Sequence, residues 1–294
     1  AQGHTKSPPE NVVITSNKNS AQVRSNEKGE SHINVSPKDV LKFRANGFVR
    51  YSDFGARGDG ETDDIDTIAA THAFANQHGL LVKADEAATY YIGGKNCTAV
   101  IRTDTDFGTA TFVIDDTDVQ NRNAHIFLVN SNLRPFKPEG IASLKKNQEK
   151  INVSLPGTCL VTVTNSRVRH YIRFGPNQNN GSPQTDIFIV DKNGNVHTDT
   201  PIIWDFDRIT DVTALPIDQK TLRISGGRFT TIANNAESKY AYYSRGIAIR
   251  RSNVLVDGLE HRVKGEGDHG APYGGFINIG DCSDVTVRNT ILTG

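Results

Sequence analysis

The stretch FVRYSDFGARGDGETDD, residues 48–64, decides the fold of this chain. Its first four residues alternate in polarity and predict a strand, and the Gly- and Asp-rich residues 53–60 predict a turn. Asp63 and Asp64 then precede apolar residues at helical spacing, which end at Gly79. An aspartate before such a run and a glycine after it are typical of the two ends of a helix. The sequence therefore predicts a strand, a turn and a capped helix in that order.

This order of elements resembles the amino-terminal signature of the pectate-lyase-like superfamily. The matching residues are Asp-Phe-Gly-Ala at 53–56, Gly-Asp-Gly at 58–60 and Asp-Asp at 63–64. The family's proline-alanine-glycine-threonine-tyrosine element after the helix is here Glu-Ala-Ala-Thr-Tyr, residues 86–90, so the strand is kept but the turn before it differs. The resemblance implies an all-β fold, a right-handed parallel β-helix with an N-terminal capping helix.

Short strands that recur along the chain favour the same fold. The segments 222–226, 254–258 and 285–289 align with one another, and each alternates in polarity before a Gly or Asn. The segment 159–165 looks like a further copy upstream. Short strands at a nearly constant spacing are typical of a solenoid.

Composition along the chain predicts its organisation. Residues 1–46 are polar and weakly patterned, which predicts an extended leader, and residues 47–294 are expected to form the β-helix domain. The N-terminal cap of that domain is expected at about 47–95. An Asn-Gly turn between two alternating stretches predicts a hairpin, so an inserted β region is expected at about 130–215. We expect the chain to continue beyond Gly294, because no polar segment caps the last predicted strand.

Charge and cysteine content exclude several classes of protein. Lys+Arg and Asp+Glu each number 33, so the formal net charge is zero, which argues against a nucleic-acid partner. The three cysteines lie far apart and form neither a disulfide framework nor a zinc-binding spacing. No apolar run approaches the length that spans a membrane. Any recognition of an anion must therefore depend on local patches, and the sequence leaves the oligomeric state open.

The residues best suited to chemistry lie between 240 and 276, where Arg, Lys, His and Tyr gather on a predicted strand and its loop. β-Elimination in a uronic-acid polymer needs a cation beside the carboxylate, a tuned base, and a proton donor for the leaving oxygen. Each candidate also fits a structural role, as an outward strand position or a locally hydrogen-bonded side chain. The candidate catalytic residues are Arg245, His261, Lys264 and Tyr273.

Neighbouring residues fit substrate and metal binding. The expected substrate-binding residues, which are aromatic or basic, are Tyr242, Tyr243, Arg250 and Arg251. Glu266 and Asp268 offer hard oxygen ligands on a Gly-flanked loop, which suits a divalent cation such as Ca²⁺. His269 beside them would favour a softer metal. A solvated charged loop explains the same residues without a metal.

These observations predict a polysaccharide lyase that acts on an acidic glycan of glycosaminoglycan or pectin type. We expect a bacterial protein that is secreted, periplasmic or at the cell surface. A glycoside hydrolase on the same scaffold is an alternative. Its candidate carboxylates are either Asp205 and Asp207 or Glu266 and Asp268. The third interpretation is a non-catalytic glycan-binding or tail-spike-like fibre protein, because one scaffold hosts several activities.

Overall fold

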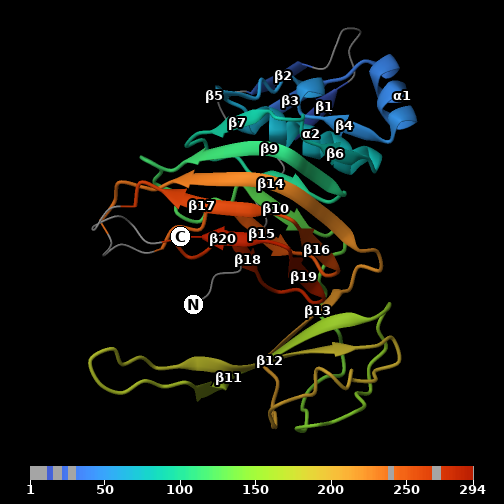
Figure 1. Ribbon diagram of the computed structural model, residues 1–294. Helices are drawn as coiled ribbons and strands as arrows, with labels where there is room; N and C mark the ends of the chain where they lie inside the picture. Colours follow the sequence, from blue (N-terminus) through green and yellow to red (C-terminus); the bar gives the residue numbers. More distant parts are fainter. Residues whose placement is uncertain (1–11, 16–21, 26–30, 238–241, 267–272, 294) are drawn as a thin grey trace. The chain divides into compact units, whose positions relative to one another are not determined.

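The computed structural model is mostly β, with 42% of residues in strands and 11% in helices. The described part of the chain comprises residues 12–15, 22–25, 31–237, 242–266 and 273–293. The chain divides into two compact units (Figure 1): residues 1–130 together with 220–294 form the first, and residues 131–219 form the second. The sequence predicts an inserted region at about 130–215, and the second unit spans a similar stretch.

The N-terminal segment contains regular structure where an extended leader was expected. Three short strands form a sheet in the order β1-β3-β2, with β1 (Val12–Thr15), β2 (Gln22–Ser25) and β3 (Ser31–Asn34). Helix α1 (Pro37–Asn46) follows. The Ser36 side chain accepts a hydrogen bond from the Asp39 N–H at 3.1 Å, and Gly47 in the left-handed conformation ends the helix. The leader predicted at residues 1–46 is therefore helical in its last part, because these caps satisfy the ends of a polar helix.

From Phe48 onward, the described strands of the first unit stack in three parallel ladders (Figure 1). The first ladder contains β4 (Phe48–Arg50), β6 (Leu81–Lys83), the start of β9 (Thr105–Asp115), the start of β14 (Leu222–Ile232), β16 (Val254–Asp257) and β19 (Val285–Arg288). The second contains β5 (Asp59–Asp63), β7 (Thr89–Ile92), the ends of β9 and β14, β17 (Glu260–Lys264) and β20 (Ile291–Thr293). The third contains β8 (Ala99–Ile101), β10 (Phe127–Asn130), β15 (Ile247–Arg250) and β18 (Ile277–Ile279).

Along the chain, strands of the first, second and third ladders follow one another in the same order, and each such round is called a pass. Leu222 pairs with Val254, and Val254 pairs with Val285, so the three repeats predicted from the sequence are confirmed in register. The fourth predicted copy, at 159–165, is wrong. It lies in the second unit and pairs antiparallel with both of its neighbours.

Helix α2 (Ile65–His78) takes the place of a third-ladder strand on the first pass. The Asn76 side chain donates to the Val100 carbonyl at 2.7 Å and accepts from the Arg102 N–H at 2.9 Å, so it satisfies backbone groups beside β8. Asp64 does not cap the helix with its side chain as expected. Its carboxylate instead accepts the backbone N–H groups of residues 57 and 58, which holds the preceding turn.

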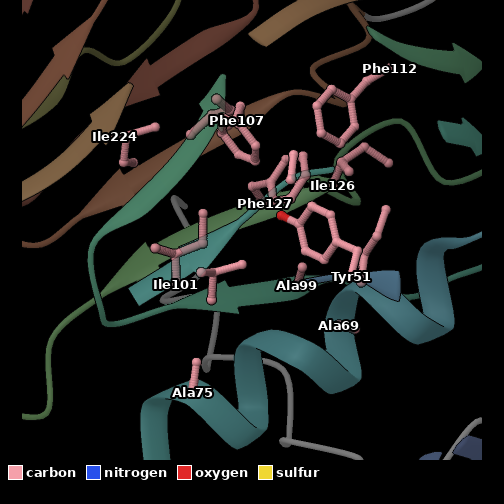
Figure 2. Packing of buried hydrophobic residues seen from close by; sticks show 14 of the residues in the cluster. Tyr51, Ala69, Ala75, Ala99, Ile101, Phe107, Phe112, Ile126, Phe127 and Ile224 are labelled. Atoms are coloured by element: carbon pink, nitrogen blue, oxygen red, sulfur yellow. The ribbon is translucent and has the colours of Figure 1, made fainter. Parts of the chain in front are cut away.

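Aromatic rings fill the core of the first unit at paired positions of the second ladder. Tyr90, Phe112 and Phe229 follow one another, with 5.1 Å between the first two ring centroids and 4.7 Å between the second two. Phe107 and Phe127 pack edge-on beside them (Figure 2). Because all five rings are buried, they supply much of the apolar area that stabilises the stack.

Gly226 allows β14 to pass from the first ladder to the second. Its φ is 67°, and a Cβ there would lie 2.5 Å from the Gly108 carbonyl oxygen. We expect Gly226→Ala to lower the free energy of unfolding by about 2–3 kcal/mol, since it adds a backbone clash to a left-handed conformation. Gly79→Ala is the matched control, because Gly79 has a φ of 65° with nothing within 4 Å of an added Cβ, and about 1 kcal/mol is expected. If urea unfolding shows the same loss of stability for both variants, the contact between the added Cβ and Gly108 is relieved by a small backbone shift.

The second unit is built on an antiparallel sheet. Its strands are β11 (Cys159–His170), β12 (Ser182–Val190) and β13 (Asp211–Pro216), in the order β12-β11-β13. The predicted Asn-Gly turn follows β12, where Gly194 has a φ of 84° and Val190 pairs with Val196. Apolar side chains of this unit form their own core, which includes Val161, Phe188 and Phe206.

Candidate functional site

The candidate site lies where the chain leaves the second ladder and enters the third. Asp116 directly follows β9, Asn234 follows β14, Arg245 precedes β15, and Tyr273 precedes β18. Parallel stacking places the same turn of successive passes side by side, so residues distant in sequence meet here. The backbone of Gly93, which follows β7, joins them from an earlier pass.

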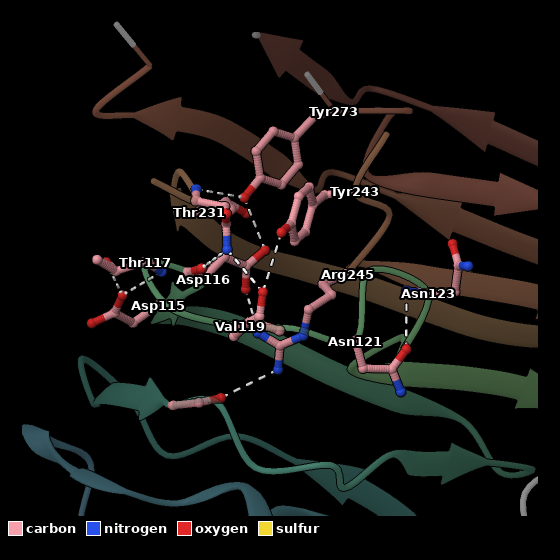
Figure 3. A network of polar contacts seen from close by, with 12 residues as sticks. Asp115, Asp116, Thr117, Val119, Asn121, Asn123, Thr231, Tyr243, Arg245 and Tyr273 are labelled. Atoms are coloured by element: carbon pink, nitrogen blue, oxygen red, sulfur yellow. Dashed lines mark hydrogen bonds and ion pairs between the residues drawn. The ribbon is translucent and has the colours of Figure 1, made fainter. Parts of the chain in front are cut away.

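A buried ion pair between Asp116 and Arg245 forms the centre of the site (Figure 3). The two side chains are 0% and 1% exposed. Arg245 donates through Nη1 to Asp116 Oδ1 and through Nη2 to the Gly93 carbonyl at 3.2 Å. The Tyr273 hydroxyl donates to the other carboxylate oxygen at 3.0 Å. Burial raises the pKa of Asp116, and the charge of Arg245 limits that rise.

Asn234 and Tyr243 extend this network to the backbone. The Asn234 side chain donates to the carbonyls of Asp116 at 2.7 Å and Val119 at 2.9 Å. Its own N–H donates to the Tyr273 hydroxyl at 3.2 Å. The Tyr243 hydroxyl donates to the Val119 carbonyl at 3.2 Å. The network therefore fixes the Tyr273 hydroxyl from two sides.

A pocket of about 240 Å³ adjoins the network. Three of the four candidate catalytic residues line it, namely Arg245, His261 and Tyr273. The fourth, Lys264, is exposed at the end of β17 and does not line the pocket. Sequence patterns thus point to three side chains that the structure brings together.

His261 occupies an inward position of β17. It pairs with Phe229 on one neighbouring strand, and its ring stacks on Phe276 with centroids 4.0 Å apart. Its Nε2 lies 3.0 Å from the Thr231 hydroxyl. Burial lowers the pKa of His261 to about 4, so the imidazole is neutral at neutral pH.

Tyr273 and Arg245, which both line the pocket, are hydrogen-bond donors of different kinds. Burial, with the nearby charge of Asp116, raises the pKa of Tyr273, so its hydroxyl keeps its proton. The Nε–H of Arg245 is buried and has no hydrogen-bond partner among the described residues. A buried donor without a partner is costly.

The four expected substrate-binding residues differ in exposure. Tyr242 is 64% exposed, whereas Tyr243 is 3% exposed. Arg250 donates to the Asn278 side chain at 2.6 Å and is partly exposed. Arg251 is buried and donates to backbone carbonyls. Tyr243 and Arg251 therefore do not lie at the surface as the prediction requires, because hydrogen bonds to the backbone hold their polar ends inside.

The structure gives partial information on the expected metal ligands. Glu266 is exposed, and Asp268 and His269 lie outside the described residues. Within the described ranges no three His, Cys, Asp or Glu side chains are grouped as metal ligands would be. Ca²⁺ binding stays a prediction.

The hydrolase candidates Asp205 and Asp207 lie in the second unit. Asp205 accepts the Lys146 N–H at 2.9 Å, and Asp207 accepts from the Asn165 side chain at 3.0 Å. Both carboxylates thus hold local structure, and their part in hydrolysis stays a prediction.

Sequence patterns give no sign of the part that Asp116 and Asn234 play. Asp116 lies 129 residues from Arg245 and 157 from Tyr273, so no local pattern relates them. The sequence does place Asp116 directly after an alternating strand, which indicates a turn residue but not a contact with Arg245.

Among the described residues, no helix is both long enough and apolar enough to cross a membrane.

Comparisons with known proteins give distant structural similarity. No protein-family model matches the chain, and no curated protein is similar to it in sequence. The tailspike protein gp49 from Pseudomonas phage LKA1 is similar with a TM-score of 0.46 and 12% identity, over 82% of this chain and 46% of that one. The Gp54 tailspike of Acinetobacter baumannii bacteriophage AP22, in complex with A. baumannii capsular saccharide, has a TM-score of 0.36 and 11% identity, over 91% and 53%. The chain spans about half the length of these tailspikes, and similarities this weak carry no argument about function.

Proposed function

We propose that the first unit is a right-handed parallel β-helix, capped by α2, that cleaves an acidic polysaccharide by β-elimination. The repeated order of the three ladders supports the β-helix. The hydrogen bonds of Asn76 to backbone groups beside β8 support the cap. The resemblance of residues 53–64 to the pectate-lyase-like signature agrees with both.

One observation carries the proposal: Arg245, His261 and Tyr273 line the same pocket. In the proposed reaction, the positive charge of Arg245, which lines the pocket, attracts the carboxylate of a uronic-acid sugar. The neutral imidazole of His261 takes the proton from the carbon next to that carboxylate. The electron pair forms the new C=C bond as the C–O bond breaks, and the Tyr273 hydroxyl gives its proton to the leaving oxygen. Asp116 holds Arg245 and Tyr273 in place.

The test is the ultraviolet absorbance of the unsaturated uronide product, with the full chain and a panel of acidic polysaccharides. Tyr273→Phe is expected to lower the rate at least about 100-fold, because it removes the proton donor. Tyr91→Phe is the matched control, since the Tyr91 hydroxyl also donates to an aspartate, Asp115, at 2.8 Å but does not line the pocket. Equal rates for Tyr273→Phe and the wild type would contradict the assignment.

A second candidate function is glycan binding without cleavage, as in a fibre protein. The observation that favours it is that Asp116 already accepts hydrogen bonds from the Tyr273 hydroxyl and from Arg245. Lys264, the remaining candidate catalytic residue, also lies outside the pocket. Polysaccharide binding with no ultraviolet signal and no new reducing ends would favour this function. New reducing ends without the ultraviolet signal would favour a hydrolase, and loss of signal with a chelator would point to the predicted cation.

A further inference from the structure

The end of the β11–β12 hairpin extends beyond the sheet of the second unit. β11 pairs with β13 only as far as Thr164, but it pairs with β12 as far as His170, opposite Ser182. We define the hairpin tip as residues 166–181. Among the described strands, none pairs with it as a third strand. In Figure 1 the tip extends away from the other strands of that unit.

Large apolar side chains are exposed on the hairpin tip. Phe174 is 89% exposed, Tyr171 is 78% exposed, and Ile172 is 47% exposed. They lie within four positions, so large exposed apolar side chains are concentrated in this short segment. Apolar side chains left exposed in such a concentration are available for contact with a partner.

The hairpin tip is also strongly basic. Arg167, Arg169 and Arg173 are exposed, and no Asp or Glu occurs from Ser166 to Thr185. In the part of the chain that the structure describes, none of the three arginines forms an ion pair. Since the whole chain is neutral, this local excess of charge selects an anionic partner.

Internal contacts hold the tip in one conformation. Gly181 has a φ of 71°, and a Cβ there would lie 2.3 Å from the His170 carbonyl oxygen. The Asn179 N–H donates to the Arg173 carbonyl at 3.3 Å, and the His170 ring stacks on Trp204 with centroids 4.5 Å apart. A segment ordered before binding loses less conformational entropy when it binds.

The apex of the tip distinguishes a glycan from a membrane. Residues 175–180 are Gly-Pro-Asn-Gln-Asn-Asn, and all are exposed. The side-chain amides of residues 177–180 would lose hydrogen bonds to water if the apex entered a bilayer, which is unfavourable. Amide groups both donate and accept hydrogen bonds, which matches the hydroxyl groups of sugars. The apex therefore favours a hydrated, hydroxyl-rich partner.

We propose that the hairpin tip is a second glycan-binding site, which binds an anionic polysaccharide through residues other than those of the pocket. The three arginines bind the carboxylate or sulfate groups, and the rings of Tyr171 and Phe174 pack on sugar faces. The choice of an acidic glycan rests on the proposed function, but the contact itself does not require cleavage.

The experiment measures binding of the full chain to chondroitin sulfate and to polygalacturonate by affinity electrophoresis, in a Tyr273→Phe background. The test variant is Arg167→Ala/Arg169→Ala/Arg173→Ala. The control variant, Arg134→Ala/Lys192→Ala/Arg208→Ala, removes the same charge from exposed positions of the same unit. We expect the test variant to bind about 10- to 100-fold more weakly and the control to stay within about twofold. Tyr171→Ser/Phe174→Ser, which changes only exposed rings, is expected to weaken binding about tenfold.

Equal weakening in the two charge variants, or no weakening in either, would overturn the proposal. So would binding of the tip to phosphatidylserine vesicles or to single-stranded DNA without binding to either polysaccharide. The two proposals fail separately. Absence of elimination by the wild-type chain, with tip-dependent binding intact, contradicts only the pocket chemistry. Elimination of short oligosaccharides, with polymer binding unchanged in the test variant, contradicts only the hairpin site.

Discussion

Asp116→Ala is expected to lower the free energy of unfolding of the first unit by about 3–5 kcal/mol. The reason is that Arg245 would keep a charge at a site where its side chain is 1% exposed, without the carboxylate that pairs with it. The hydroxyl of Tyr273 would lose its acceptor in the same step. Loss of one partner of a buried pair costs more than the pair itself contributes, because the remaining charge stays desolvated.

Three further measurements make this expectation specific. Asp257→Ala breaks an ion pair with Arg288 whose side chains are 30% and 56% exposed, so less than about 1 kcal/mol is expected. Asp116→Leu combined with Arg245→Met removes both charges and is expected to recover most of the loss. The one tryptophan, Trp204, lies in the second unit, so its fluorescence follows that unit while far-ultraviolet circular dichroism follows both. An equal effect of Asp116→Ala and Asp257→Ala on urea unfolding would contradict the buried pair.

Acid is expected to destabilise the first unit as the pH falls below about 6.5. His72 is fully buried, its Nε2 lies 2.8 Å from the Tyr51 hydroxyl, and burial lowers its pKa from 6.5 to about 3. The pKa of His261 falls to about 4 for the same reason. The folded chain therefore keeps both imidazoles neutral, while the unfolded chain binds protons as the pH falls below 6.5. Their contribution to stability is complete above pH 6.5 and is lost progressively toward the folded-state pKa values.

The expected loss is on the order of 3–5 kcal/mol when both histidines are counted down to about pH 4.5, where one unit of pKa difference is worth about 1.4 kcal/mol. His72→Gln should flatten the stability curve between pH 6.5 and about 4.5, since glutamine does not titrate. His197→Gln is the control, because the His197 side chain is 54% exposed. Urea midpoints measured across this range give the slope directly. A slope unchanged by His72→Gln would show that His72 is protonated in the folded state.

The local part of the fold was predictable from the sequence. The Asp-Asp pair and Gly79 bracket α2, which spans Ile65–His78, because helix ends depend on neighbouring residues. Helix α1 was missed for a physical reason. Phe43 is its one buried hydrophobic residue among those described, so α1 lacks an apolar stripe.

Long-range pairing was the part that local patterns could not supply. Residues 159–165 alternate in polarity like the repeats, but alternation shows only that a strand has two faces, not which strands lie beside it. The same limit applies to the site. Arg245, His261 and Tyr273 were found by residue type. The role of Asp116 depends on its contact with Arg245, and the two residues are separated in sequence by the whole second unit.

That separation has a consequence for synthesis of the chain. Asp116 precedes Arg245 by 129 residues, which a ribosome translating about 5–20 residues per second needs roughly 6–26 s to make. During this interval the edge of β9 that later pairs with β14 stays open, and the second unit is made in full. Completion of the Asp116–Arg245 pair is therefore a late event of cotranslational folding. If a ribosome stalls within residues 131–219, Arg245 has not yet been made. The nascent chain then contains Asp116 without its ion-pair partner.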